Sequence, residues 1–161
     1  MKTKKTWRDK LQDSKDLPKT VPIPEKMRKN WGEGTLVIPA PLEVDEIMKK
    51  VPKGKLITIN EIRAMLAERH GTTIACPLTT GIFARIAAEA ANEEAVGGKK
   101  RITPYWRTLK AGGELNRKYP GGVEAQRALL ESEGHRVIQK GKRFFVADYD
   151  KSLLRDTKTR H

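Results

Sequence analysis

Residues 58–90, TINEIRAMLAERHGTTIACPLTTGIFARIAAEA, carry the signals of two helices joined by a turn of about six residues. Thr58 followed by Glu61 has the capping-box spacing that opens a helix. The apolar residues that follow have helical spacing: Ile59, Ile62, Met65 and Leu66 up to His70-Gly71, then Ile82, Phe83, Ile86, Ala87 and Ala90. Pro77 suits the first position of the second helix because its missing N–H needs no partner there. The stretch therefore predicts a helix-turn-helix.

The segment before this stretch predicts one strand and one helix. Thr35-Leu36-Val37-Ile38 is a β-prone run that ends at Pro39. From Leu42, apolar residues at Val44, Ile47, Met48 and Val51 form one helical face, and Pro52 with Gly54 ends it. We expect the compact domain to begin at residue 35.

The segment after the stretch predicts a loop, a fourth helix and a hairpin. Residues 93–101 read as a loop, and residues 102–122 have too many prolines and glycines for a long element. Residues 123–133 predict a helix capped by Gly134. Residues 136–139 and 144–146 predict a β-hairpin around the basic tip 140–143. The chain is thus predicted to be mainly α with a small β-hairpin, as a winged helix-turn-helix.

Charge points to an anionic partner. The 161 residues hold 33 Lys and Arg against 20 Asp and Glu, and residues 1–30 carry +6 of the net +13. We expect a basic, partly disordered arm over residues 1–34, a domain over 35–149 and a basic tail over 150–161. So basic a chain favours an anionic polymer or surface as its partner. With a winged helix-turn-helix predicted, we expect this partner to be double-stranded DNA and the protein to be a monomer.

Composition excludes several classes of protein. A single cysteine, Cys76, cannot form an intrachain disulfide, and three scattered histidines offer no zinc spacing, so we expect no metal and no cofactor. No apolar run is long enough to span a bilayer, and residues 1–9 lack the apolar core of a signal peptide. We expect a cytoplasmic, nucleoid-associated protein.

Four motifs in a fixed order resemble one known family. They are VPKGK with TINEI at 51–62, PYWR at 104–107, YPGGV at 119–123 and LLESEG at 129–134. Their order and spacing resemble the DNA-binding domain of the alkylguanine DNA alkyltransferases, whose landmarks read IPxGxxTTYGEI, PCHR, YxGG and LLxxEG. The resemblance implies a winged helix-turn-helix that binds the minor groove, flips a damaged guanine and transfers its alkyl group to a cysteine.

The sequence departs from the family pattern at the residues that carry out alkyl transfer. Tyr105 stands at the acceptor-cysteine position and Trp106 at that of the histidine that relays a proton. Glu133 matches the glutamate that orients this histidine, and here we interpret it as a polar residue in a last helical turn. A phenol without a neighbouring base is a poor nucleophile at neutral pH. We therefore expect no alkyl transfer.

Two positions that serve base flipping also differ. Ile59 replaces the tyrosine that rotates the nucleotide, and Leu78 replaces the arginine that fills the vacated stack. Ile59 reads more simply as a core residue, whereas Leu78 could still act as an apolar wedge. The family's alkyltransferase-like subgroup lacks the acceptor cysteine and binds alkylated DNA for other repair proteins, and the chain resembles a distant branch of it.

The candidate site residues follow from these comparisons. DNA contact is expected from Leu78, Thr79, Thr80, Arg85, Arg107, Lys140, Lys142 and Arg143. A base pocket is expected from Ile59, Tyr105, Trp106, Tyr119, Gly121 and Gly122. The cations of residues 99–101 either track phosphates or are solvated. Two alternatives stay open: a winged-helix regulator that binds DNA or RNA without lesion specificity, and an active methyltransferase that uses Cys76.

Overall fold

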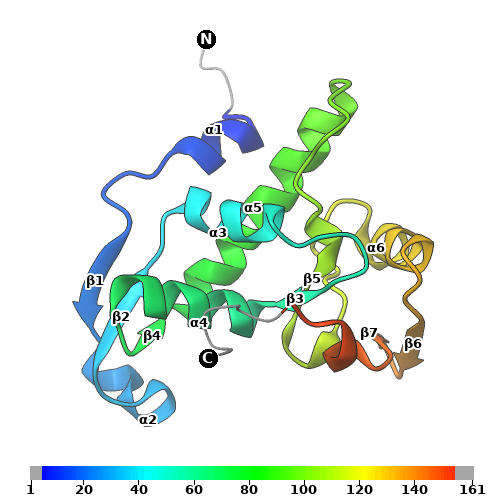
Figure 1. Cartoon of the computed structure of the whole chain (residues 1–161). Helices are drawn as coiled ribbons and strands as arrows, with labels where there is room; N and C mark the ends of the chain where they lie inside the picture. Colours follow the sequence, from blue (N-terminus) through cyan, green and yellow to red (C-terminus); the bar gives the residue numbers. More distant parts are fainter. Residues whose placement is uncertain (1–4, 155–161) are drawn as a thin grey trace.

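The computed structural model describes residues 5–154, a mainly helical chain with three small sheets. Its α-helices are α1 (Trp7–Gln12), α2 (Arg28–Trp31), α3 (Pro41–Lys49), α4 (Ile59–His70), α5 (Pro77–Val96) and α6 (Gly122–Ser132). The helix α5 is central, because α1, α3 and α4 all pack against it (Figure 1). Among the described residues, no helix is long and apolar enough to cross a membrane.

The strands form three separate sheets. Their bounds are β1 (Lys19–Pro22), β2 (Thr35–Ile38), β3 (Ile57–Thr58), β4 (Ile74–Ala75), β5 (Thr108–Leu109), β6 (Val137–Lys140) and β7 (Arg143–Val146). In the first sheet, β2 pairs antiparallel with β1 and parallel with β4. The strands β3 and β5 pair in parallel, and β6 and β7 form an antiparallel hairpin.

The helices α4 and α5 have the ends expected from their sequence. The Glu61 carboxylate accepts hydrogen bonds from the N–H and the hydroxyl of Thr58, at 2.8 and 2.6 Å. Gly71 ends α4 in the left-handed conformation, and Pro77 opens α5. The prediction of a loop over residues 93–101 is wrong for its first four residues, because α5 continues to Val96. Between Gly81 and Gly97 the sequence has no glycine or proline, so nothing local ends the helix sooner.

Two apolar clusters form the body of the domain. The larger one gathers α3, α4 and α5, where alanines such as Ala84, Ala87 and Ala88 let neighbouring helices approach closely. The smaller one lies between α6 and the hairpin, around Leu109 and Leu130. Trp106 packs against both clusters, so the loop that carries the family-like motif joins them.

Residues 5–34 of the predicted arm lie against the domain. The helix α1 contacts α5 and buries Leu11, and β1 extends the sheet of β2 (Figure 1). After β1, the 3-10 helix η1 (Glu25–Met27) and α2 turn back toward the start of α5. Residues 1–4 and the end of the predicted tail, 155–161, lie outside the described residues.

The hairpin β6–β7 forms as predicted but has a tighter turn. Lys140 pairs with Arg143 across the hairpin, so Gly141 and Lys142 alone make the turn. Gly141 has a φ of +64°, which a two-residue hairpin turn requires. The predicted four-residue basic tip is therefore a two-residue turn flanked by two cations in the strands.

Candidate nucleic-acid interface

The loop that carries the PYWR motif is short and firmly held. It forms the 3-10 helix η2 (Tyr105–Arg107) and runs directly into β5, which pairs with β3. The indole N–H of Trp106 donates to the Glu133 carboxylate at 3.0 Å. Glu133 follows the last residue of α6 as its C-cap, so a helix end and this loop are tied together.

Arg107 completes this polar cluster. Its guanidinium donates to both oxygens of Glu133, at 2.9 Å from Nε and 2.6 Å from Nη2. A third bond, of 2.7 Å, reaches the carbonyl of Val51. Burial raises the pKa of Glu133, but hydrogen bonds from Arg107 and Trp106 outweigh it and the net pKa is lowered. The carboxylate is thus a charged structural anchor, and Arg107, predicted to contact DNA, is bound inside the protein.

Tyr105 lies inside an aromatic trio. Its ring meets those of Trp106 and Tyr119 edge to face, with centroids 5.4 and 5.5 Å apart. Tyr105 is 5% and Tyr119 3% exposed, and both belong to the larger apolar cluster. Burial, with the charge of Glu89, raises the pKa of the Tyr105 hydroxyl, which weakens it further as a nucleophile.

A buried glutamine that the sequence analysis overlooked supports the same loop. Gln126 is fully buried, and its side-chain amide donates to the carbonyl of Trp106 at 3.1 Å. Its side-chain oxygen accepts from the N–H of Asn116 at 2.8 Å. The signal was present in the sequence, since Gln126 interrupts the apolar spacing from Val123 to Leu130. A polar residue in such a stripe indicates an internal hydrogen-bond partner.

The first turns of α5 expose apolar side chains. Leu78 is 62% and Ile82 56% exposed, and their spacing of four residues places them on one helical face. Thr80 is fully buried, where its hydroxyl donates to the carbonyl of Cys76 at 2.7 Å. Thr79 is half-buried, and among the described residues its hydroxyl has no hydrogen-bond partner. Of the predicted contacts on this turn, Leu78 is the exposed one.

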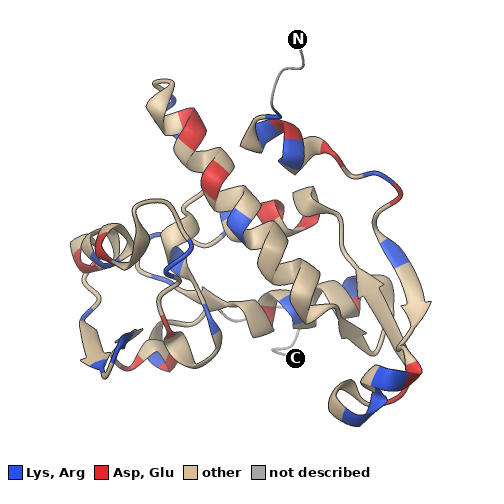
Figure 2. Cartoon of the chain, turned by 180° about the vertical axis from the view of Figure 1, so that it is seen from behind, with Lys and Arg blue, Asp and Glu red and all other residues tan. Residues whose placement is uncertain are grey.

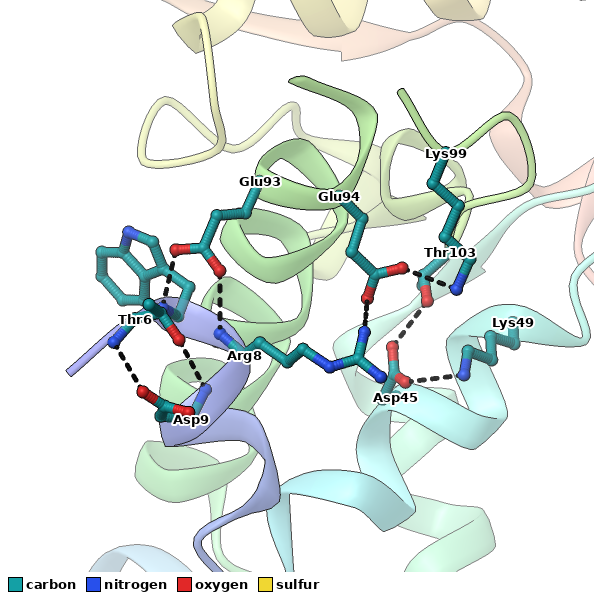
Figure 3. Close-up of polar contacts among 10 residues, drawn as sticks. Thr6, Arg8, Asp9, Asp45, Lys49, Glu93, Glu94, Lys99 and Thr103 are labelled. Atoms are coloured by element: carbon teal, nitrogen blue, oxygen red, sulfur yellow. Dashed lines mark hydrogen bonds and ion pairs between the residues drawn. The ribbon is translucent and has the colours of Figure 1, made fainter. Parts of the chain in front are cut away.

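Arg85 lies further along α5, beside the N-terminal helix. Its guanidinium lies 5.6 Å from the centre of the Trp7 ring, and the ammonium group of Lys10 lies 4.2 Å from the same ring. Figure 3 shows how α1 is fixed there: the Glu93 carboxylate accepts the N–H groups of Trp7 and Arg8 at 2.9 and 3.1 Å. The helix α1 therefore adjoins the one basic residue predicted on α5.

The three predicted wing cations differ in their partners. Arg143 makes two hydrogen bonds to the Glu114 carboxylate, at 3.1 and 2.9 Å. Lys140 lies 5.6 Å from the Phe145 ring, and Lys142 is exposed in the turn. Within residues 5–154, neither lysine has an ion-pair partner. The hairpin thus offers two lysines to solvent, with Arg143 already paired.

The remaining candidates occupy mixed positions. Ile59 is half-buried at the start of α4 and packs against the larger cluster. Gly121 is exposed and Gly122 half-buried; their φ values are +75° and +68°. An added Cβ at Gly121 would lie 2.5 Å from the Ala125 side chain, so this turn excludes other residues. Cys76 is 7% exposed and packs in a third apolar cluster.

The mainly helical arrangement with small sheets is the fold of an alkyltransferase-like protein of known structure, and the fold family expected from the motifs is confirmed at this level. The chain is similar to S. pombe Atl1 in complex with damaged DNA containing O6-carboxymethylguanine, at 18% identity, with a TM-score of 0.50 over 72% of this chain and 94% of that one. A second complex, S. pombe ATL with DNA, has 16% identity and a TM-score of 0.46 over the same shares. No family model and no curated protein matches the chain.

Proposed function

We propose that the protein is a non-catalytic, alkyltransferase-like DNA-binding protein that recognises alkylated bases in duplex DNA for repair. Residues 35–149 form the DNA-binding unit in this proposal. The helix α5 faces the minor groove, and the β6–β7 hairpin acts as a wing beside the backbone. The protein acts as a monomer in the cytoplasm, on the nucleoid.

One observation carries the proposal: Glu133 holds Trp106 at the position of the proton-relaying histidine. An indole N–H can only donate, so it cannot accept a proton from a nucleophile. With Tyr105 at the acceptor position, the loop keeps its anchoring carboxylate but has neither nucleophile nor base. A retained loop without chemistry is what a recognition protein of this fold requires.

The exposed end of α5 supports the binding mode. Leu78 stands at the position of the arginine that fills the stack in the family, and its side chain is 62% exposed. An apolar side chain inserted between base pairs offsets part of the unstacking cost, as it does in other minor-groove proteins. Leu78 followed by Ile82 would form such a wedge.

The decisive experiment compares two matched duplexes, one with a single O6-alkylguanine and one with guanine. We expect tighter binding to the alkylated duplex by at least about tenfold, which corresponds to about 1.4 kcal/mol. Equal affinity for both would favour the regulator without lesion specificity. A stoichiometric mass gain on Cys76 after incubation would instead show an active alkyltransferase.

A further inference from the structure

A cationic hook in the N-terminal arm lies beside the exposed end of α5. We define the hook as residues 23–34, which contain η1 and α2. Its apolar side chains Met27 and Trp31 pack on the cluster of Ile23, Leu36 and Cys76. Cys76 is the N-cap residue of α5. This packing therefore places the hook next to the start of α5, although the two segments are distant in sequence.

The charges of the hook point away from this packing. Lys26, Arg28 and Lys29 are all exposed, and within residues 5–154 none of them forms an ion pair. The acids of the hook are Glu25 and Glu33, so its net charge stays positive. Figure 2 shows the blue ribbon of α2 at the end of the molecule where α5 begins.

Three other cations of the arm form ion pairs within the protein. Lys5 pairs with Asp13 at 3.0 Å, Arg8 with Glu94 at 2.9 Å and Lys19 with Asp16 at 3.0 Å. Three cations of the first part of the arm are thus ion-paired, whereas within residues 5–154 the three cations of the hook are not.

A further cation approaches the same place from α4. The guanidinium of Arg63 donates to the carbonyl of Ala75 at 2.9 Å, one residue before Cys76. Arg63 and the hook therefore lie at the same end of α5 as the exposed apolar side chains of Leu78 and Ile82. Apolar side chains flanked by cations suit a duplex, whose base stack lies between two phosphate backbones.

We propose that the hook is a second DNA-contacting element, in which Lys26, Arg28 and Lys29 bind backbone phosphates flanking the site that α5 occupies. This inference rests on the proposed function. The expected partner of the hook is the phosphate backbone of duplex DNA, without sequence preference.

The test compares the salt dependence of duplex binding between two triple variants of equal charge. The hook variant is Lys26→Gln, Arg28→Gln and Lys29→Gln. The control is Lys99→Gln, Lys100→Gln and Arg101→Gln, beyond the far end of α5, which is about 30 Å long. Each phosphate contact contributes about −0.9 to the slope of log K against log salt. The slope should therefore become shallower by about 2.7 in the hook variant and by less in the control.

Duplex length gives a second readout. Flanking contacts need flanking DNA, so the hook variant should lose affinity on a duplex of about two helical turns and little on one of about one turn. A hook variant whose slope equals that of the native chain, or equal loss on both duplexes, would overturn the inference while leaving the proposed function in place. Failure of the native chain to bind duplex DNA would overturn both.

Discussion

The indole of Trp106 donates to Glu133 across 3.0 Å, between the loop that would carry the chemistry and the end of α6. Arg107 donates to the same carboxylate from the neighbouring position. Since the side chains of Glu133 and Arg107 are only 6% and 13% exposed, their ion pair is shielded from water. The three residues therefore form one polar cluster that joins the two apolar clusters of the domain.

The first prediction concerns the stability that this cluster provides. Glu133→Gln leaves the buried guanidinium of Arg107 without its charged partner, so the free energy of unfolding should fall by about 1.5–3 kcal/mol. The measurement is urea unfolding of both proteins at neutral pH. Glu131→Gln is the matched control, because Glu131 is 46% exposed and, among residues 5–154, its one ion-pair partner is Arg127. This control should cost about 0.5 kcal/mol or less.

The second prediction is the pH dependence of that difference. The pKa of Glu133 is lowered in the folded protein, below the ordinary 4.5. Its contribution to stability is therefore fully present above the unfolded value and is lost as pH falls through the folded value. The stability gap between the native chain and Glu133→Gln should narrow as the pH falls below 4.5, where the Glu133 carboxylate becomes protonated. A gap that widens as the pH falls below 4.5 would contradict the assignment.

The third prediction separates the cations of the hairpin. Lys140→Ala with Lys142→Ala should lower the slope of log K against log salt for duplex DNA by up to about 2, since each contact contributes about 0.9. Arg143→Ala should change the slope by much less, because Glu114 holds its guanidinium. Glu114→Gln would release Arg143 and steepen the slope. If Arg143→Ala has the largest effect of the three, the wing assignment is wrong.

The fourth prediction concerns the attachment of α1 to α5. Glu93→Gln weakens the two charge-assisted bonds to the N–H groups of Trp7 and Arg8, so α1 should detach more often. We expect faster tryptic cleavage at Arg8 and Lys10 with the rest of the domain intact. Glu94→Gln is the comparison, since it weakens the ion pairs with the side chains of Arg8 and Lys99 and leaves the bonds to the N–H groups in place. Equal cleavage rates in both variants would argue against a role for Glu93.

Local signals were sufficient for the elements whose ends depend on neighbouring residues. Thr58 with Glu61, Gly71 and Pro77 mark ends of α4 and α5 because capping is decided within a few residues. The same holds for the hairpin, whose turn needs Gly141. These signals, together with the motif order, were enough to predict the fold.

Partners that are distant in sequence could not be predicted. Glu93 bonds to residues about 86 positions earlier, and Glu114 to a residue 29 positions later. Nothing in the local sequence distinguishes these carboxylates from solvated ones. The same limit applies to Glu133, which we interpreted as an ordinary residue in a last turn although it anchors the loop. The hook was likewise hidden in the predicted arm, since its position depends on packing against Cys76.

The last prediction restores the chemistry that the loop lacks. Tyr105→Cys with Trp106→His rebuilds the PCHR motif of the family, and Glu133 already lies where it can bond a ring N–H at position 106. Removing the buried ring of Tyr105 also opens space for a base, at a cost in stability of about 3–5 kcal/mol by analogy with other large aromatic truncations. We expect Cys at position 105 of the double variant to accept one methyl group from an O6-methylguanine duplex, with guanine as the leaving group. Because the thiol loses its proton, the net mass gain is that of CH2. The native chain should not be methylated, and the Tyr105→Cys variant alone should be methylated more slowly than the double variant, because Trp106 cannot act as a base. A double variant that is folded and binds the duplex but takes up no methyl group would show that this loop does not receive a flipped base, and lesion recognition would have to be abandoned in favour of plain duplex binding.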